Sequence, residues 1–328
     1  MLPVALKVED SSRTSEARTS VRKLAQGLGF DEEGTERAAI VVTETCTNLL
    51  KHGGGGTLHL LANPEDLSIE LLALDRGPGM ENWQRCLADG YSTTGTAGNG
   101  LGAIARLSAF SDAYTQTGRG TALFSVIGKT KGVKAAAPRI GGIRVPKPGE
   151  DVCGDDWGVK RGAAGVSLVL ADGLGHGFDA AAAARRAVEI FQSHANASPK
   201  TVLESIHQGL RHTRGAAVTV VNLDEERRLA VAAGLGNVAA FICERSGLRR
   251  QLVTMNGTAG VESRTLFREF SYPWPPEASL VLHSDGLVSH WDLDNHPGLI
   301  CRAPGLIAGV LFRDGCRGND DATVVVAA

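Results

Sequence analysis

Aspartates follow short apolar segments at widely separated places in the C-terminal half of this sequence. The clearest case is Asp172, which follows the strand-like segment 166–171 and stands directly before Gly173. A carboxylate at a strand end, beside a glycine whose carbonyl can point the same way, is suited to holding a hard cation. The alternative is that Asp172 and Gly173 form only a turn, because Asp-Gly is a common turn pair.

The same arrangement recurs, and its recurrence favours one shared site over several independent turns. Asp285 follows the mostly apolar segment 279–284, Asp320 stands just before the strand-like segment 324–327, and Asp155 lies in an acidic group before another expected strand. Like charges that are brought together repel unless protons or cations neutralise them. Oxygen-only ligands suit Mg²⁺ or Mn²⁺ rather than zinc. These carboxylates are therefore predicted to converge around divalent ions.

In order and spacing, these motifs resemble the metal-binding motifs of the SpoIIE-like branch of the PPM-type metal-dependent serine/threonine phosphatases, over roughly residues 149–328. The resemblance implies two Mn²⁺ or Mg²⁺ ions at one end of a β-sandwich, with Asp172 bridging them in the catalytic centre and Gly173 lending its carbonyl. The residues implied to hold the ions are Asp155, Asp172, Gly173, Asp285 and Asp320. The implied activity is hydrolysis of phosphoserine or phosphothreonine on a protein by in-line attack of hydroxide.

A second polar group lies in the N-terminal half of the chain. Glu44 and Asn48 are four residues apart in an otherwise apolar helical segment, so they share one helix face. A Glu and an Asn at this spacing usually form only a solvated stripe on a helix. Here the surrounding residues are apolar, which indicates that the pair has a function. Asp75 ends a strand-like segment and leads into a glycine turn, and the glycine-rich segment 95–102 runs into a helical pattern. Backbone amides at such a helix start are suited to binding phosphates.

These residues resemble the N box and the two glycine boxes of the GHKL ATP-binding fold. The similarity is closest to the anti-sigma-factor serine kinases of the RsbW and RsbT kind, over about residues 10–128. It implies that Glu44 is the general base of a serine kinase, that Asn48 ligates the Mg²⁺ of ATP, and that Asp75 hydrogen-bonds the adenine amino group. The glycines implied to bind the nucleotide are Gly77, Gly79, Gly98, Gly100 and Gly102. Because the segment that would cover ATP is short, binding is a firmer expectation than turnover.

The elements that must position these residues divide into two domains, as expected for 328 residues. The fold class expected is α+β, with an N-terminal GHKL α/β sandwich at 1–130 and a PPM-type αββα sandwich at 149–328. Residues 131–148 are basic and rich in Gly and Pro, so they are predicted to be a linker that can still add an edge strand.

Hydrophobic periodicity places the helices and strands around the candidate residues. Helices are expected at 12–28, 31–51, 101–110, 179–195 and 199–213, and strands at 57–62, 67–75, 111–117, 121–128, 166–171, 218–224, 228–236 and 238–244. Both sets of candidate polar residues then fall within or at the ends of regular elements.

Composition excludes several classes of function. The net charge of −2 gives no field that would attract nucleic acid or an anionic membrane. The six cysteines show no disulfide or zinc spacing, and no window resembles a signal sequence or a membrane span. The protein is therefore expected to be cytoplasmic, with neither nucleic acid nor membrane as a partner.

The two resemblances together imply a bifunctional switch in bacterial partner switching, with opposed kinase and phosphatase activities on one chain. The implied substrate is a phosphorylated STAS-domain protein that acts as an anti-sigma antagonist, and ATP is the second ligand. Two alternatives remain open: a non-enzymatic adaptor that ATP binding gates and that sequesters a STAS or anti-sigma partner, and a kinase with an inert phosphatase domain. His176, beside the predicted metal cluster, is either an acid in the reaction or merely exposed.

Overall fold

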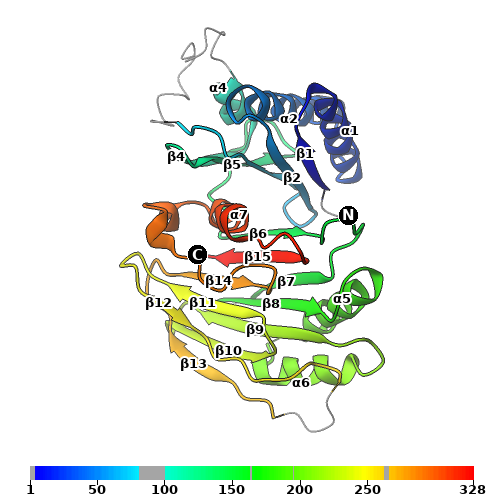
Figure 1. Ribbon diagram of the computed structural model, residues 1–328, viewed down its shortest axis with the longest axis vertical. Coiled ribbons are helices and arrows are strands. Elements are labelled where there is room, and N and C mark those ends of the chain that lie inside the picture. Colours follow the sequence, from blue (N-terminus) through cyan, green and yellow to red (C-terminus); the bar gives the residue numbers. More distant parts are fainter. Residues whose placement is uncertain (1–3, 81–99, 163–164, 195, 262–265) are drawn as a thin grey trace. The chain divides into compact units, whose positions relative to one another are not determined.

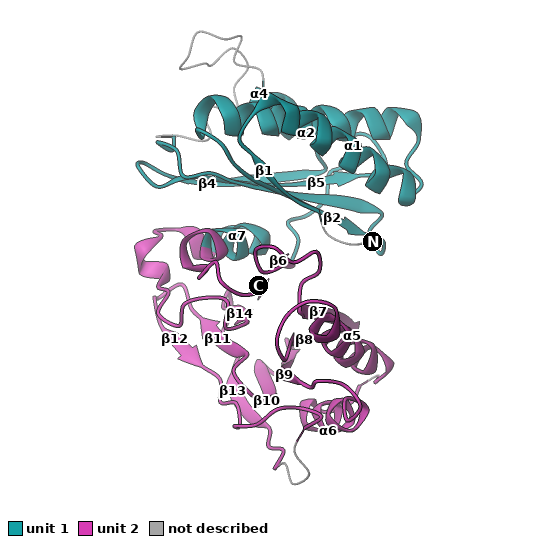
Figure 2. Ribbon diagram, turned by 45° about the vertical axis from the view of Figure 1, so that its right-hand side comes forward, with its two compact units in different colours: residues 1–139, 301–310 teal, residues 140–300, 311–328 magenta. Residues whose placement is uncertain are grey.

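The computed structural model describes residues 4–80, 100–162, 165–194, 196–261 and 266–328. The chain divides into two compact units, which Figure 2 colours separately. Unit 1 comprises Met1–Arg139 and Cys301–Val310, and unit 2 comprises Ile140–Ile300 and Leu311–Ala328. Each unit combines helices with antiparallel sheets, so the predicted α+β class is confirmed. None of the helices described is long and apolar enough to cross a membrane.

Unit 1 is built on one five-stranded antiparallel sheet with the strand order β1-β2-β3-β5-β4. Its elements, most of them labelled in Figure 1, are β1 (Val4–Val8), α1 (Ser11–Gly27), α2 (Glu32–His52), β2 (Gly56–Asn63), β3 (Ser68–Leu74), α4 (Gly100–Leu107), β4 (Phe110–Gln116) and β5 (Gly120–Gly128). The helices and strands predicted here are present with small shifts at their ends, and strand β1 was not predicted.

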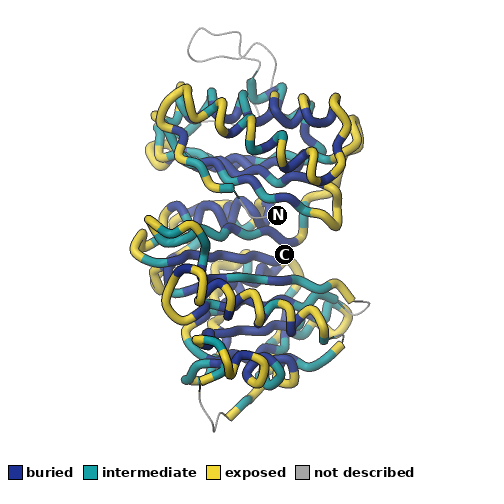
Figure 3. Tube along the Cα trace, turned by 90° about the vertical axis from the view of Figure 1, so that its right-hand side faces the viewer, coloured by how far each residue is buried: buried dark blue, intermediate teal, exposed yellow. Residues whose placement is uncertain are grey.

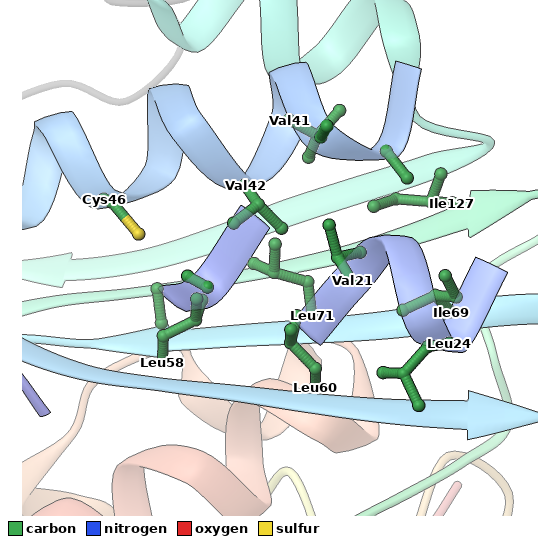
Figure 4. Packing of buried hydrophobic residues seen from close by; sticks show 14 of the residues in the cluster. Val21, Leu24, Val41, Val42, Cys46, Leu58, Leu60, Ile69, Leu71 and Ile127 are labelled. Atoms are coloured by element: carbon green, nitrogen blue, oxygen red, sulfur yellow. The ribbon is translucent and has the colours of Figure 1, made fainter. Parts of the chain in front are cut away.

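The core of unit 1 lies between the helices α1 and α2 and one face of the sheet. Figure 4 shows Val21 and Leu24 of α1 and Val42 of α2 packed among side chains that include Leu60 and Leu71 from β2 and β3. Apolar residues at helical spacing in the sequence therefore form the buried faces of both helices. The rest of α2 is free to carry polar residues, among them Glu44 and Asn48.

Local chemistry fixes where α2 begins and ends. The Asp31 side chain caps the helix by accepting a hydrogen bond of 2.7 Å from the Gly34 amide. Glu32 and Glu33 occupy the first turn, where the helix dipole favours negative charge. Gly53 ends the helix, and its amide donates to the Leu49 carbonyl. The length of α2 thus follows directly from sequence signals.

Unit 2 contains two five-stranded antiparallel sheets, ordered β13-β10-β9-β8-β7 and β12-β11-β14-β15-β6. Their strands are β6 (Ile140–Val145), β7 (Asp155–Gly162), β8 (Gly165–Gly173), β9 (Ala216–Asp224), β10 (Leu229–Leu235), β11 (Ala239–Cys243), β12 (Arg249–Gln251), β13 (Phe270–Pro273), β14 (Ser279–His283) and β15 (Ala322–Ala327). The helices are α5 (Phe178–Ser193), α6 (Pro199–Gly209) and two short 3₁₀ helices, η1 (Leu293–Asn295) and η2 (Leu299–Cys301). A further helix, α7 (Pro304–Gly315), precedes β15 and was not predicted; its residues up to Val310 belong to unit 1 and the rest to unit 2.

The side chains of β8 show how the layers of unit 2 are assembled. Leu168 and Leu170 belong to the core between the two sheets, whereas Val169 and Ala171 belong to the core under α5 and α6. This alternation is the period of two that a strand buried on both faces requires. Figure 3 shows the resulting buried layers of the chain trace. The apolar segment before Asp172 is thus a central strand.

Strand register decides which ends of the two sheets carry carboxylates. In the first sheet, Asp155 at the start of β7 pairs with Asp172 near the end of β8. In the second sheet, the end of β14 pairs with β15 through His283 and Val324. Asp285 and Asp320 therefore stand just beyond neighbouring strand ends. Strand β6, within the segment 131–148, adds the edge strand foreseen there by pairing with β15.

Candidate metal centre and nucleotide site

Asp155 is the most enclosed of the predicted metal ligands, with 1% of its surface exposed. Its Oδ2 atom accepts a hydrogen bond of 2.7 Å from the Ser284 hydroxyl. The same hydroxyl oxygen accepts a bond of 3.0 Å from the Thr323 amide. Because Asp155 belongs to one sheet while Ser284 and Thr323 belong to the other, a single serine joins both sheets at this end. Sequence reasoning missed Ser284, although its place directly before Asp285 was a signal.

Burial and mutual repulsion both oppose ionisation of these carboxyl groups. Burial raises the pKa of Asp172 to about 9, and the charges of Asp155, Asp285 and Asp320 add to that effect. Burial likewise raises the pKa of Asp155 to about 7 against the lowering effect of the Ser284 hydrogen bond. The pKa of Asp285 is also raised, first by burial and then by Asp320. The residues predicted from sequence are therefore brought into one electrostatic neighbourhood.

The donor atoms here fit a hard divalent cation. Asp155 Oδ1 and Asp321 Oδ2 are buried without a hydrogen-bond partner among the described residues, and both are carboxyl oxygens. Among the residues described, no group of three His, Cys, Asp or Glu side chains is close enough to enclose an ion. The carboxylates are thus gathered at one end of the sandwich without forming a closed cage. Asp321 was not among the predicted ligands, although it follows Asp320 directly.

Asp321 also organises the loops around the centre. Its Oδ1 atom accepts a hydrogen bond of 2.9 Å from the Lys147 amide. A Cβ atom on Gly154 would lie 2.7 Å from Asp321 Oδ2, and one on Gly286 would collide with the Asp321 carbonyl oxygen. The loops before β7 and after β14 therefore both close on Asp321, which requires glycine at two positions.

Gly173 lies where the backbone packs tightly against the first turn of α5. A Cβ atom at Gly173 would collide with the Ala180 carbonyl oxygen, so no larger residue fits there. The Gly173 amide donates to the Gly154 carbonyl over 3.1 Å, which ties the ends of β8 and the loop before β7 together. This close approach explains why the sequence places glycine directly after Asp172.

The two histidines near the centre have different surroundings. His176 Nδ1 lies 2.6 Å from Glu150 Oε1, and both side chains are partly exposed. Buried His283 accepts a hydrogen bond of 3.0 Å from the Trp291 indole nitrogen at Nε2, so its proton is on Nδ1, which lies 2.8 Å from the Ser284 carbonyl oxygen. Burial lowers the pKa of His283, which agrees with a neutral, structural ring. The contacts of His283 are therefore those of a structural residue.

In unit 1, Glu44 and Asn48 lie beside the start of α4. A Cβ atom at Gly100 would lie 2.9 Å from Glu44 Oε2 and 3.5 Å from Asn48 Oδ1. The Asn48 side-chain nitrogen is buried and has no hydrogen-bond partner in the part of the chain that the structure describes. Gly102 is buried two residues further along α4. The structure thus brings four predicted residues of the nucleotide site together, and Gly98 lies outside the described residues.

Asp75, which is predicted to bind the adenine amino group, directly follows β3. Its Oδ1 atom accepts hydrogen bonds from the amides of Gly77 at 2.9 Å and Thr121 at 3.0 Å. A Cβ atom on Gly79 would collide with the Gln116 carbonyl oxygen, and Gly79 has a positive φ of 73°. These contacts hold the Asp75 carboxylate in one orientation, and the glycines let the loop after β3 approach β4 closely.

Comparison with known families agrees with this geometry. The family model described as Stage II sporulation protein E (SpoIIE) matches residues 162–328, just over half of the chain. The chain belongs to the SpoIIE family. Its SpoIIE domain is a protein serine/threonine phosphatase domain of the PPM type, as predicted. The match includes Asp172, Asp285 and Asp320, whereas Asp155 precedes it.

The N-terminal part matches a second family model, the histidine kinase-like ATPase domain, over residues 8–124. Thus a GHKL-type domain precedes the SpoIIE domain, which confirms the predicted pair of families and their order.

Individual relatives fall into the same two groups. Phosphoserine phosphatase RsbX of Bacillus subtilis (strain 168) is 22% identical over 43% of this chain and 70% of its own length. The serine/threonine-protein kinase RsbT of the same organism is 28% identical over 34% of this chain and 84% of its own length. A solved chain of the bacterial stressosome, a modular system adapted to control secondary messenger signalling, is 26% identical with a TM-score of 0.54, over 58% of this chain and 98% of that chain. The two curated relatives are thus a phosphatase and a kinase, in line with the two family models.

The raised pKa of Asp155 leads to a stability prediction. Folding raises the pKa of the Asp155 carboxyl group to about 7, so its protonated form contributes to the stability of the fold at low pH. This contribution to the free energy of unfolding is lost as the pH rises from the ordinary carboxyl range to about 7. At pH 8 without divalent ions, Asp155→Asn should therefore melt roughly a few degrees above the wild type. Calorimetry would measure this, and Mn²⁺ should raise the melting temperature of the wild type more than that of the variant.

Asp224→Asn is the matched control, because Asp224 ends β9 and pairs with Gly165, at the opposite end of β8 from Asp172. The melting temperature of this control, and the rise in it on adding Mn²⁺, should equal those of the wild type. A melting temperature of Asp155→Asn at or below that of the wild type at pH 8 would contradict the electrostatic account.

The fixed orientation of Asp75 predicts a selective loss of nucleotide binding. Asp75→Asn replaces a carboxylate oxygen with a donor and should weaken ADP binding about tenfold or more in titration calorimetry. Asp66→Asn, in the turn at the other end of β3, should bind ADP like the wild type. Equal affinities of all three proteins would remove Asp75 from the nucleotide site.

Proposed function

We propose that this protein is a bifunctional switch that removes phosphate from, and adds phosphate to, a serine or threonine of a STAS-domain protein in bacterial partner switching. The SpoIIE domain would be a phosphatase that depends on two Mn²⁺ or Mg²⁺ ions, and the GHKL-type domain would be an ATP-dependent serine kinase. The observation that carries the phosphatase part is the convergence of Asp155, Asp172 and Asp285, with raised pKa values, at one end of the sandwich.

The residues of the phosphatase site would do three things. Asp172 would bridge the two ions with the Gly173 carbonyl beside it, and Asp155, Asp285 and Asp320 would complete the coordination. Ser284 would hold the Asp155 carboxylate in position from the opposite sheet. When bound, the ions would supply hydroxide at neutral pH and would neutralise the phosphoryl oxygens. With that chemistry supplied, no side chain of this chain would need to become a covalent intermediate.

In the GHKL-type domain, the proposed roles follow from where polar atoms face the start of α4. Asn48 has an unpaired buried amide beside Gly100, a position suited to ordering the metal and phosphates of ATP. Glu44 lies next to the same glycine and would take the proton from the substrate hydroxyl. Asp75 would bind the adenine amino group. Phosphoryl transfer of this kind needs mainly positioning and charge neutralisation, which these groups supply.

The proposed partner rests on the relatives. RsbX is a phosphoserine phosphatase, RsbT is a serine/threonine kinase, and a stressosome chain is among the similar structures. Opposed activities of these two kinds, joined in one chain, would let nucleotide supply or partner abundance set the phosphorylation state of one substrate. This supports a STAS-domain protein as the common substrate of both sites.

The phosphatase proposal predicts a strict requirement for Asp172. Asp172→Asn should lower Mn²⁺-dependent hydrolysis of p-nitrophenyl phosphate by at least about a thousandfold, because one bridging charge is lost. The control Asp224→Asn should retain the wild-type rate. A folded Asp172→Asn protein, verified by circular dichroism, that hydrolyses the ester normally would refute the metal centre.

The kinase proposal predicts that labelled γ-phosphate reaches a STAS-domain protein encoded near this chain only when Glu44 is present. Glu44→Gln should slow transfer by about a hundredfold, the contribution typical of a general base, while ATP binding persists. Glu36→Gln is the control, because Glu36 is an exposed residue of the same helix that pairs with Arg22. Mass spectrometry would follow the phosphoprotein. If the wild type transfers no phosphate in the presence of Mg²⁺, the domain acts as an ATP-gated adaptor instead.

A further inference from the structure

We propose that His283 and Trp291 are positioning residues of the phosphatase site. Their hydrogen bond fixes the turn that carries Asp285, and it thereby determines how tightly the carboxylates at this end of the sandwich bind a divalent ion. The inference rests on the proposed metal-dependent phosphatase activity, and it assigns a part in that site to two residues outside the set of predicted ligands.

Asp285 is carried on a tight turn that begins directly after β14. The Leu287 amide donates to the Ser284 carbonyl oxygen over 3.3 Å, which closes the turn around Asp285 and Gly286. Nδ1 of His283 donates to the same carbonyl oxygen over 2.8 Å. This oxygen belongs to the peptide group that joins Ser284 to Asp285, and the shorter of its two bonds comes from the imidazole. The His283 ring therefore fixes the orientation of that peptide group.

Trp291 determines which nitrogen of the His283 ring carries the proton. Its indole N–H donates to Nε2 over 3.0 Å, and an indole nitrogen can only donate. The proton of the neutral ring is therefore on Nδ1, which makes Nδ1 the donor to the Ser284 carbonyl oxygen. Without the indole donor the other tautomer becomes accessible, and it would turn a nitrogen lone pair toward that carbonyl oxygen.

Phe241 and Arg249 hold these two rings in place. The Phe241 ring of β11 stacks on His283 with 5.8 Å between ring centres and 8° between ring planes, and it meets Trp291 edge-on at 5.1 Å. The Arg249 guanidinium of β12 lies 4.7 Å from the centres of both the Phe241 and the Trp291 rings, and Arg249 also donates to the Trp291 carbonyl oxygen. All three rings are buried. Contacts other than the indole N–H thus hold the Trp291 ring, so the donor can be removed while the packing is kept.

The turn connects these rings with two predicted metal ligands. The Ser284 hydroxyl donates to Asp155 Oδ2 over 2.7 Å, and Asp285 Oδ2 accepts a bond of 2.7 Å from the Asn237 side-chain amide. His283 takes part in neither bond, so it acts on both ligands through the Ser284 backbone. Loss of a group that orients metal ligands from behind lowers metal affinity by about ten- to a hundredfold. The expected effect of the histidine–tryptophan pair is therefore on metal binding.

The experiment measures the Kd of Mn²⁺ for the metal-free protein by titration calorimetry, together with hydrolysis of p-nitrophenyl phosphate over a range of Mn²⁺ concentrations. Trp291→Phe keeps an aromatic ring against Phe241 and Arg249 but removes the N–H donor. It should raise the Kd of Mn²⁺ about tenfold, and raise by the same factor the Mn²⁺ concentration that gives the half-maximal rate. Saturating Mn²⁺ should restore most of the lost rate, which would not occur if the defect lay in the chemical step.

Two variants of His283 test the donor to the turn itself. In His283→Asn the side-chain amide nitrogen is bonded to Cγ, as Nδ1 is, so it can still donate to the Ser284 carbonyl oxygen. His283→Leu fills much of the same space and donates nothing. The Kd of Mn²⁺ should rise about tenfold or more in His283→Leu and by clearly less in His283→Asn.

Trp274→Phe is the matched control, because Trp274 is also a buried tryptophan, in the core between the two sheets of unit 2. It follows Pro273, which pairs with Leu229, and Leu229 pairs with Asp224. Trp274 therefore lies at the end of this sheet opposite Asp172. This variant should have a lower melting temperature, because a core side chain becomes smaller, and an unchanged Kd of Mn²⁺.

The outcomes separate this inference from the proposed function. A wild type that neither binds Mn²⁺ nor hydrolyses p-nitrophenyl phosphate would overturn both. A wild type that does both, with the same Kd of Mn²⁺ in folded Trp291→Phe, would overturn the positioning role alone, as would equal weakening in Trp291→Phe and Trp274→Phe. If circular dichroism shows that Trp291→Phe does not fold, the His283 variants decide, because equal Kd values for His283→Asn and His283→Leu would exclude the donor role.

Discussion

Repulsion between carboxylates at one end of a β-sandwich is the constraint on which the arrangement of the phosphatase unit depends. Asp155 and Asp172 face each other across β7 and β8, and Asp285 and Asp320 extend from the adjoining sheet. The raised pKa values of Asp155 and Asp172 indicate that neighbouring protein groups do not compensate the charges of these two carboxylates. The glycines and the serine hydroxyl around these carboxylates hold this unfavourable arrangement in place.

In the GHKL-type unit, the close approach of the backbone matters more than the grouping of charged side chains. Glycines stand at positions where a Cβ atom would collide with the Gln116 carbonyl oxygen or lie close to the Glu44 carboxylate. One polar helix face, with Glu44 and Asn48, looks toward the start of α4. The opposite face packs on the sheet through residues such as Val42 and Cys46. A single helix thereby supplies both the core of the unit and its proposed chemistry.

Much of this could be predicted from the sequence, because the decisive signals are local. Asp31 and Gly53 mark the ends of α2, and each Asp-Gly pair follows an apolar strand. What could not be predicted depends on register or on tertiary context. The pairing of Asp155 with Asp172 follows from the ladder between β7 and β8, and the role of Ser284 follows from the approach of two separate sheets. Strand β1 is short, and Gly305 and Gly309 weaken the helical signal of α7.

Ser284 gives the catalytic end a property beyond orientation. Its hydroxyl bonds to Asp155 and Thr323 at once, so it tolerates no slippage between the two sheets. A molecule in which one sheet has moved by a residue would turn the wrong side chain toward Asp155. The position of the Asp155 carboxylate therefore depends on the packing of both sheets, and a fault in either one is felt at this end of the sandwich.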